Sequence, residues 1–364
     1  MKIIFFFGHP AHFHLFINPI MALRKRNHEI KVLIKTKDIL EVLCKEKHLD
    51  FINILPEGRK DNKLAMLLGL LKRDLRISKI VKHFRPNLLI GSEVALAHVG
   101  RIFRIPSIIL SEDDAEQVMS FSRLGYPFVS TLLSPEMCSA GKWEKKRVAY
   151  NSYHELAYLH PKYFKPDKHC LQENISFVKP YYIIRFSALT AYHDTGRTGI
   201  TKSIAYKIIE LCETHGQLYI TSECKLEPVF EDYRININPI NIHHAIYFAD
   251  FFIGDSQTMT AEAAVLGTPA LRFNDFVGKL GYLEELEHRY GLTYGIKTSE
   301  PERLFEKIDE LLKMKDRSQV WQQRRQKMLE DKIDVTAFMV WFIENYPDSV
   351  EMMKKDPSYQ YRFK

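Results

Sequence analysis

A run of hydroxyl and amide side chains in the second half of the chain stands between an apolar strand pattern and a helical pattern. Residues 251–253 are all apolar, and residues 258–266 repeat apolar positions at helical spacing before Gly267, which fits a left-handed helix end. The first N–H groups of a helix lack backbone partners and carry partial positive charge. The pattern therefore predicts a seat for a pyrophosphate. The residues expected to form this seat are Gly254, Ser256, Gln257, Thr258 and Thr260.

Glu262 stands one turn into this expected helix. Its carboxylate could accept hydrogen bonds from a ribose diol beside the pyrophosphate. An ordinary β–α–β unit, in which Ser256 and Thr258 only cap the helix, explains the same pattern. On the residues alone, both interpretations stay open.

Three histidines, His9, His12 and His14, follow the first apolar run and enter a helical pattern. An imidazole has a pKa close to neutral pH and can take a proton from an acceptor hydroxyl. We therefore assign His14 or His9 as a catalytic base and expect His12 to contact substrate. Two alternatives stay open: the rings only bond the loop and cap the helix, or they bind phosphate or a metal. No metal is expected, because no acidic ligand is fixed beside them.

Acidic residues follow two of the expected strands. Glu112, Asp113 and Asp114 come after residues 106–110, and they form either a solvated turn or a carboxylate cluster. We take Asp113 as the catalytic candidate and Glu112 as a substrate contact. Glu93 follows residues 87–90, where Ser92 is expected to cap a helix and Glu93 to favour its dipole.

Arg185 lies near the end of the strand expected at residues 181–186. A guanidinium at a strand end can clamp a diphosphate with two parallel hydrogen bonds. A surface arginine paired with a carboxylate is the alternative. His193, farther along the same polar run, is a further histidine candidate.

Short apolar runs alternate with helical periods along the chain, which predicts parallel sheets covered by helices on both faces. The alternation lapses at residues 163–180, so we expect a linker there between two domains, residues 1–165 and 180–335. Strands are expected at residues 2–7, 29–35, 50–53, 87–90, 106–110, 128–133, 147–149, 181–186, 217–221 and 251–253.

Composition indicates a compact protein with anionic partners. The chain has 364 residues, 46% of them apolar, and a formal net charge of +7, which suits two domains and ligands such as a nucleotide sugar, an acidic glycan or a lipid surface. No basic arm or aromatic motif indicates nucleic acid. The five scattered cysteines fit a reducing cytoplasm without disulfides or zinc. The first residues predict a strand rather than a secretion signal, and no run approaches transmembrane length.

A basic amphipathic helix is expected at residues 61–83. Most such helices turn the apolar stripe to the core, but some rest on anionic lipid, so peripheral membrane contact stays open. The stripe expected from the spacing is Leu64, Leu67, Leu71 and Leu75.

The polar run at residues 254–262 resembles the donor-nucleotide motif of sugar-nucleotide enzymes with the GT-B fold. In the lipid-linked UDP-N-acetylglucosamine transferase of cell-wall synthesis, a Ser-Gly-Ala-Leu-Thr-x-x-Glu run precedes a Gly-x-Pro-Ala strand; Ser256 to Glu262 and residues 267–270 correspond here. The non-hydrolysing UDP-N-acetylglucosamine 2-epimerases carry a similar Asp-Ser-Gly-Gly-x-x-x-Glu run. Over nearly its whole length the chain resembles the domain-of-unknown-function 354 family, through residues 9–14 (HPAHFH) and 278–286 (GKLGYLEEL). The second run adds Lys279 and Leu280 to the expected substrate contacts.

The resemblance implies an α/β chain with two doubly wound, Rossmann-like domains facing a cleft, the GT-B fold, and a last segment, 336–364, packed back on the first domain. It also implies a glycosyltransferase that moves a sugar from a UDP-sugar, its co-substrate, to a glycan or lipid-linked acceptor in the cytoplasm or at the inner face of the membrane, without another cofactor. Two departures argue against an epimerase: the His-Arg-x-Glu motif is missing, and Gln257-Thr258 replaces Gly-Gly. Phe16 stands where many plant-type GT-B transferases have their base histidine. An epimerase and a non-catalytic nucleotide-sugar-binding protein remain the alternatives.

Overall fold

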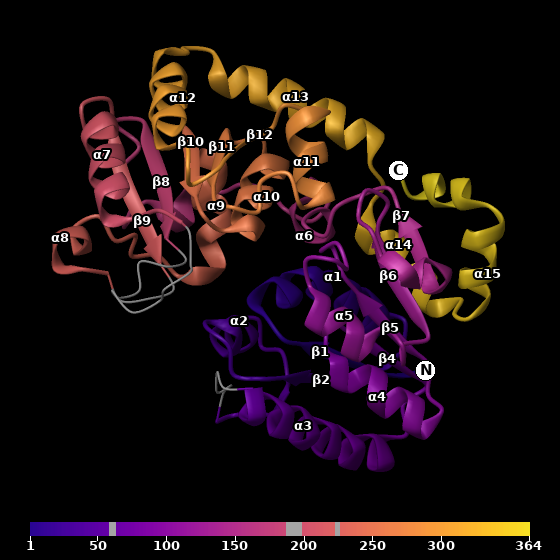
Figure 1. Ribbon diagram of the computed structural model, residues 1–364. Coiled ribbons are helices and arrows are strands. Elements are labelled where there is room, and N and C mark those ends of the chain that lie inside the picture. Colours follow the sequence, from indigo (N-terminus) through magenta and orange to yellow (C-terminus); the bar gives the residue numbers. More distant parts are fainter. Residues whose placement is uncertain (58–62, 187–198, 223–225) are drawn as a thin grey trace. The chain divides into compact units, whose positions relative to one another are not determined.

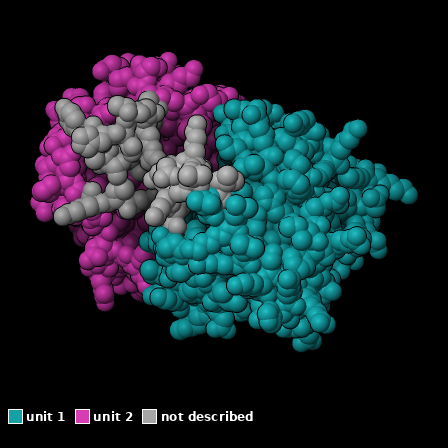
Figure 2. Space-filling view, turned by 60° about the horizontal axis from the view of Figure 1, so that its bottom comes forward, with its two compact units in different colours: residues 1–163, 332–364 teal, residues 164–331 magenta. Residues whose placement is uncertain are grey.

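The computed structural model describes residues 1–57, 63–186, 199–222 and 226–364 (Figure 1). They form two compact units, which Figure 2 colours separately. Unit 1 comprises Met1–Tyr163 and Lys332–Lys364, and unit 2 comprises Phe164–Asp331. Each unit is built on its own parallel sheet.

The sheet of unit 1 has seven strands in the order β3-β2-β1-β4-β5-β6-β7, and every neighbouring pair is parallel. Its order reverses at β1, which pairs with β2 on one side and with β4 on the other. In open parallel sheets, ligands bind beyond the carboxyl ends of the strands at such a reversal. The strands are β1 (Lys2–Phe7), β2 (Glu29–Ile34), β3 (Ile52–Asn53), β4 (Leu88–Gly91), β5 (Ser107–Leu110), β6 (Thr131–Pro135) and β7 (Arg147–Tyr150).

The central strands of unit 1 are apolar on both faces, because helices cover both. Ile3 to Phe7 in β1 are 0% exposed, which is the pattern of a parallel sheet within an α/β unit. Helix α14 packs against α1 and α6. The helices of unit 1 are α1 (Pro10–Lys25), α2 (Leu40–Glu46), α3 (Lys63–Phe84), α4 (Val94–Phe103), α5 (Met119–Gly125), α6 (Leu156–Leu159), α14 (Val335–Glu344) and α15 (Asp348–Lys355), with 3-10 turns η1 (Gly141–Lys146) and η4 (Pro357–Phe363).

The sheet of unit 2 has five parallel strands in the order β12-β11-β10-β8-β9. Its order reverses between β8 and β10, and the register sets Gly254 opposite Arg185 on one side and Arg272 on the other. The strands are β8 (Tyr181–Phe186), β9 (Gln217–Ser222), β10 (Phe251–Gly254), β11 (Ala270–Phe273) and β12 (Thr293–Ile296). The helices are α7 (Lys202–Glu213), α8 (Pro228–Glu231), α9 (Ile242–Phe248), α10 (Gln257–Leu266), α11 (Gly281–His288), α12 (Pro301–Lys313) and α13 (Arg317–Asp331), with 3-10 turns η2 (His169–Leu171) and η3 (Pro239–Asn241).

The α/β prediction is confirmed, but the stripe expected on the long basic helix is wrong. Among residues 68–84 of α3, the buried apolar side chains are Leu70, Ile77, Val81 and Phe84; the side chains of Leu64 and Leu67 lie outside those that the structure describes. Leu71 and Leu75, expected to lie on one apolar stripe with Leu64 and Leu67, are 51% and 67% exposed. The spacing alone could not separate the two faces, because leucines occur on both. Residues 61 and 62, the expected start of this helix, lie outside the described residues.

Within the described residues, no helix is both long enough and apolar enough to span a membrane. The cysteines among them, Cys44, Cys138, Cys170 and Cys212, are free thiols.

Candidate functional site

The first two histidines of the loop after β1 are held by backbone N–H groups. Nδ1 of His9 accepts from the N–H of Ala11 at 3.2 Å as the N-cap of α1, and Nδ1 of His12 accepts from Gly8 at 3.0 Å. In a neutral ring whose Nδ1 accepts, Nε2 carries the proton. For His12 this leaves Nε2–H as a hydrogen-bond donor.

His12 stays neutral at pH 7, because burial, followed by the nearby His9, Lys35 and His154, holds its pKa well below the usual value. His14 is held differently, with its ring stacked on Tyr158 at a centroid distance of 5.2 Å.

A fourth histidine, His154, joins this cluster from the segment after β7. Its Nδ1 lies 3.3 Å from Oε2 of Glu112, and its ring stacks on Tyr150. Burial lowers its pKa to about 3. The sequence analysis missed it, although the run Asn151–Glu155 was a signal, since polar residues directly follow an expected strand.

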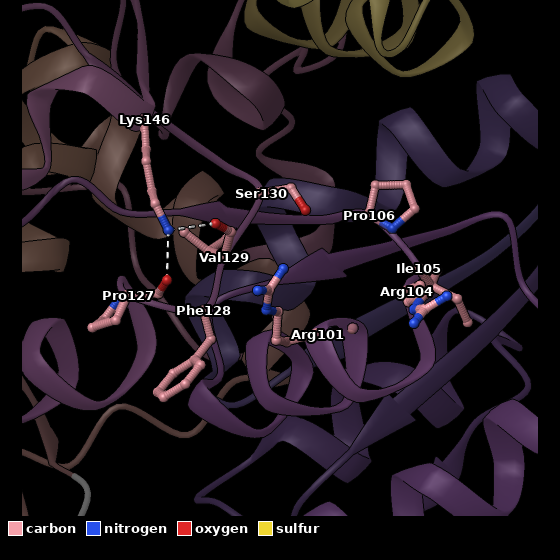
Figure 3. A pocket seen from close by; sticks show the side chains of 10 residues that line it. Arg101, Arg104, Ile105, Pro106, Pro127, Phe128, Val129, Ser130 and Lys146 are labelled. Atoms are coloured by element: carbon pink, nitrogen blue, oxygen red, sulfur yellow. Dashed lines mark hydrogen bonds between the residues drawn. The ribbon is translucent and has the colours of Figure 1, made fainter.

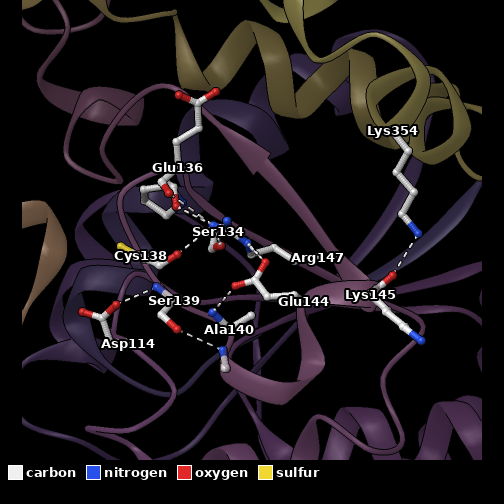
Figure 4. A network of polar contacts seen from close by, with 12 residues as sticks. Asp114, Ser134, Glu136, Cys138, Ser139, Ala140, Glu144, Lys145, Arg147 and Lys354 are labelled. Atoms are coloured by element: carbon white, nitrogen blue, oxygen red, sulfur yellow. Dashed lines mark hydrogen bonds and ion pairs between the residues drawn. The ribbon is translucent and has the colours of Figure 1, made fainter.

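The acidic segment after β5 is tied to the turn that follows β6, as Figure 4 shows for Asp114 and Ser139. The Asp114 carboxylate accepts from the N–H of Ser139 at 2.6 Å, and the Glu112 carbonyl accepts from the Cys138 thiol at 2.8 Å. Arg147 completes the network by donating to the Cys138 carbonyl at 2.7 Å. Asp114 is thus part of the scaffold that holds the segment.

Asp113 differs from its neighbour. Burial, followed by the negative charge of Asp114, raises its pKa above the ordinary value for aspartate. A carboxyl group whose protonated form is favoured can donate as well as accept a proton, so Asp113 suits proton transfer.

Glu93 is only 4% exposed and is paired with two cations that the sequence analysis did not single out. Its carboxylate lies 3.2 Å from Nζ of Lys35, which follows β2, and 3.4 Å from Nε of Arg73 on α3. Glu93 itself is the N-cap residue of α4, and the hydroxyl of Ser92 donates to the Leu110 carbonyl. The prediction that Ser92 caps this helix is therefore wrong, because its hydroxyl is used to tie β4 to β5.

In unit 2, the strand, polar turn, helix and glycine end form as predicted around α10. Ser256 is the N-cap, with Oγ accepting from the N–H of Met259 at 3.4 Å, and Gly267 ends the helix at φ 75°. Gln257 and Thr258 lie half-buried in the first turn. Gly254 is required at the strand end, because a Cβ there would meet the Phe252 ring at 2.9 Å. The turn thus presents a helix start at the carboxyl edge of the sheet, where an anion can bind.

Two expected contacts of this region are corrected. Thr260 is 0% exposed, and its hydroxyl donates to the Ser256 carbonyl at 2.7 Å, so its side chain is used inside the helix. Leu280 is 1% exposed in the core of unit 2 and cannot present its side chain to a ligand. Lys279 beside it is exposed, 6.0 Å from the centroid of the Phe276 ring.

Glu262 is held by a residue that the sequence analysis missed. Nε2 of His243 on α9 lies 2.9 Å from its Oε1, and both residues are 4% exposed. His243 lies well before the polar run at residues 254–262, so no sequence signal separated it from the other histidines.

Two arginines flank Gly254 in register. Arg185 donates from Nη1 to Oγ1 of Thr221 at 3.1 Å, and Arg272, 0% exposed, donates from Nη2 to Oε1 of Glu284 at 3.0 Å. Nε and Nη1 of Arg272 have no hydrogen-bond partner within the described parts of the chain. Arg272 escaped the sequence analysis because it lies within an otherwise apolar strand. His193 falls in residues 187–198, outside the described residues.

Across residues 1–57, 63–186, 199–222 and 226–364, no group of three His, Cys, Asp or Glu side chains is arranged to hold a metal ion.

The fold is similar to solved sugar-nucleotide enzymes. UDP-GlcNAc 2-epimerase from Neisseria meningitidis bound to UDP-GlcNAc matches with a TM-score of 0.58 at 14% identity, covering 91% of this chain and 99% of that one. MnaA of S. aureus with UDP matches with a TM-score of 0.68 at 12% identity, covering 96% of this chain and 97% of that one. The spinosyn rhamnosyltransferase SpnG with thymidine diphosphate matches with a TM-score of 0.62 at 14% identity, covering 95% of this chain and 100% of that one. At these identities the likeness concerns the fold, and the prediction of a GT-B fold with two Rossmann-like domains is confirmed.

No curated protein sequence matches the chain. The family model described as "Protein of unknown function (DUF354)" matches residues 2–343. The chain therefore belongs to the DUF354 family.

Proposed function

We propose that the protein is a GT-B-type glycosyltransferase that takes a UDP-sugar as donor and a glycan or lipid-linked molecule as acceptor in surface polysaccharide synthesis. The observation that carries the proposal is the start of α10: a Ser256-capped helix at the carboxyl edge of a parallel sheet, with Arg185 in register with Gly254. Unpaired N–H groups and an arginine are the donors that a diphosphate needs.

We assign the donor to unit 2. The diphosphate lies on the N–H groups of the Ser256–Thr258 turn, with Gln257 beside it and Arg185 near the phosphates. Glu262, whose carboxylate is oriented by His243, receives the ribose hydroxyls, and Lys279 adds a positive charge. Fixed N–H dipoles and cations stabilise the leaving UDP without a metal or another cofactor.

We assign the acceptor to unit 1. A base must offer a lone pair to the acceptor hydroxyl. His14, whose ring is positioned by stacking on Tyr158, is the preferred base, and His9, the N-cap of α1, is the second choice. His12 donates a hydrogen bond to substrate. Glu112, whose carboxylate contacts His154, also binds substrate. Asp113 assists or orients the acceptor.

Binding of UDP-sugars tests the donor seat. A ligand at 100 times its Kd stabilises the folded state by about 2.7 kcal/mol, so thermal unfolding with a panel of UDP-sugars reports binding. Arg185→Gln should weaken UDP about tenfold, because a charge-assisted pair is lost. Arg303→Gln, an exposed arginine of the same unit paired with Glu300, is the matched control and should leave UDP binding unchanged. If no nucleotide binds, and Glu262→Ala also changes nothing, the proposal is wrong.

An epimerase is the second candidate, favoured by displaced pKa values in unit 1, raised for Asp113 and lowered for His12, because epimerisation needs acids and bases around the sugar ring. Solvent deuterium at C2 of the sugar would establish it. Binding without turnover, unaffected by His14→Ala and Asp113→Ala, would instead indicate a non-catalytic nucleotide-sugar-binding protein.

The outer face of α3 supports a peripheral membrane contact, at the cytoplasmic side where UDP-sugars are the donors. Leu68, Leu71 and Leu75 are 57%, 51% and 67% exposed, one turn apart on the helix. Lys79 and Lys82 continue the helix and are exposed. Exposed leucines followed by lysines suit the interface of an anionic bilayer.

A further inference from the structure

A basic region lies in unit 1, at the amino-terminal edge of its sheet and away from the candidate site. A cavity of about 660 Å³ opens between the end of α4 and the residues that lead into β5 and β6 (Figure 3). The loops of the candidate site leave the opposite, carboxyl ends of the same strands. We call this cavity the basic pocket, and its lining includes Arg101, Arg104, Pro106, Phe128, Ser130 and Lys146.

The ammonium of Lys146 is fixed in the wall of the basic pocket. It donates to the carbonyls of Tyr126, Pro127 and Val129 at 3.0, 2.6 and 2.9 Å, and Figure 3 shows the last two of these bonds. An ammonium group has three N–H donors, so all three are used. Lys146 therefore contributes a positioned positive charge and no further hydrogen bond.

The two arginines of the basic pocket have no such partners. Both are exposed, and within the described parts of the chain neither guanidinium makes an ion pair or a side-chain hydrogen bond. No carboxylate is among the lining residues. Burial, followed by the positive charge of Arg101, lowers the pKa of Lys146. Three cations are thus gathered around one hollow without a counter-charge, an arrangement that an anion would stabilise.

The rim of the basic pocket is partly apolar. Phe128, which lines it with Pro106 and Pro127, is 44% exposed and is held edge-on by the His98 ring at 5.0 Å. Such a rim suits a ligand in which the anionic group carries an apolar part.

We propose that the basic pocket binds a phosphate group, with the guanidiniums of Arg101 and Arg104 as its hydrogen-bond donors and Lys146 as a fixed charge behind them. Guanidinium forks match phosphate oxygens in pairs, which favours phosphate over a monovalent halide. The phosphate comes either from a free small molecule or from the headgroup of a lipid whose chain contacts Phe128. The site is independent of the donor seat proposed in unit 2.

Calorimetric titration tests the proposal on the full chain, with UDP present throughout to occupy the proposed donor seat. One arm uses inorganic phosphate. The other uses dihexanoyl phosphatidic acid below its critical micelle concentration, so that no bilayer is offered to α3. The double variant Arg101→Gln/Arg104→Gln should weaken binding about tenfold or more in whichever arm binds.

The matched control is Arg85→Gln/Arg123→Gln, which removes the same charge from exposed arginines of unit 1 outside the pocket. Arg85 also shares the left-handed backbone of Arg104, at φ 52° against 55°. Equal affinity for both probes would identify a free phosphate ligand, and tighter binding of the lipid would identify a headgroup with chain contacts. The proposal is overturned if neither probe binds, or if the control variant loses as much affinity as the pocket variant.

Discussion

The carboxyl edges of the two sheets carry different kinds of polar group. In unit 2 the edge offers fixed donors: the N–H groups at the start of α10 and the guanidinium of Arg185. In unit 1 the edge gathers titratable side chains whose pKa values are displaced, among them His12, Asp113 and His154. Fixed donors bind an anion at any pH near neutrality, whereas displaced titratable groups suit proton transfer.

The difference suggests a division between binding in unit 2 and proton transfer in unit 1. Variants in one unit should then change one property and leave the other. The following predictions test that division, beginning with the largest expected effect.

Loss of the proposed base should reduce turnover without reducing nucleotide binding. His14→Ala should lower turnover by about 100-fold or more, the usual contribution of general base catalysis, while thermal stabilisation by UDP stays the same. His9→Ala should cost less, because Nδ1 of that ring is already engaged by Ala11. His83→Ala, at the exposed end of α3, is the control. Full turnover by His14→Ala, or equal losses of turnover and UDP binding, would contradict the division.

Removal of the buried carboxylate of unit 1 should lower stability. Glu93→Ala leaves Lys35 and Arg73 without their partner, at side-chain exposures of 20% and 13%. Breaking a buried ion pair costs about 3 kcal/mol or more of the free energy of unfolding, measured by urea denaturation. Glu29→Ala removes an exposed carboxylate paired with Lys2 and should cost less than about 1 kcal/mol. Similar losses for the two variants would show that the pairing of Glu93 with Lys35 and Arg73 contributes no more to the free energy of unfolding than an exposed ion pair does.

The buried histidines predict a loss of stability in acid. The folded-state pKa of His154 is about 3, below the ordinary 6.5, so its contribution is complete above pH 6.5 and is lost as the pH falls towards 3. One such group changes the free energy of unfolding by up to about 1.4 kcal/mol per pH unit in that window. His154→Gln should therefore flatten the fall between pH 6 and pH 4, measured by urea denaturation at each pH. His48→Gln, which replaces an exposed histidine of the same unit, should leave the loss of unfolding free energy in acid unchanged. If His154→Gln shows the same loss as the unmodified protein, the lowered pKa of His154 does not cause it.

The donor seat could be predicted from the sequence because it is local. Ser256, the helix after it and Gly267 are consecutive in the chain, and their order alone specifies a strand, a capped helix start and a left-handed end. The interior of the same helix was less predictable, because whether the hydroxyl of Thr260 faces a ligand or its own helix depends on packing.

The cluster in unit 1 is harder to predict, since it joins segments far apart in the chain. His154 meets Glu112, and Lys35 meets Glu93, only because the sheet order brings the ends of their strands together. A single sequence indicates that each strand ends in polar residues, but it does not give the strand order. The prediction of the buried face of α3 was wrong for a related reason. Leucines lie on both faces of this helix, and only the packing on α4 decides which of them are covered.

The smallest effect is expected at the outer face of α3. Replacing Leu71 and Leu75 by serine should reduce sedimentation with vesicles of anionic lipid about fivefold, because each leucine loses only part of the 1.5–3 kcal/mol that full burial of its side chain contributes. Turnover with a water-soluble acceptor should not change, since neither residue belongs to the edge that carries the histidines.

Val178→Ser is the matched control, because this residue of unit 2 is 91% exposed and lies outside α3. The two variants separate a specific face from general surface hydrophobicity. If Val178→Ser reduces vesicle binding as much as the leucine pair does, the exposed leucines are ordinary surface residues. If only the leucine pair does, and the effect weakens as salt screens the lysines, then membrane contact belongs to unit 1, the unit to which the acceptor is assigned.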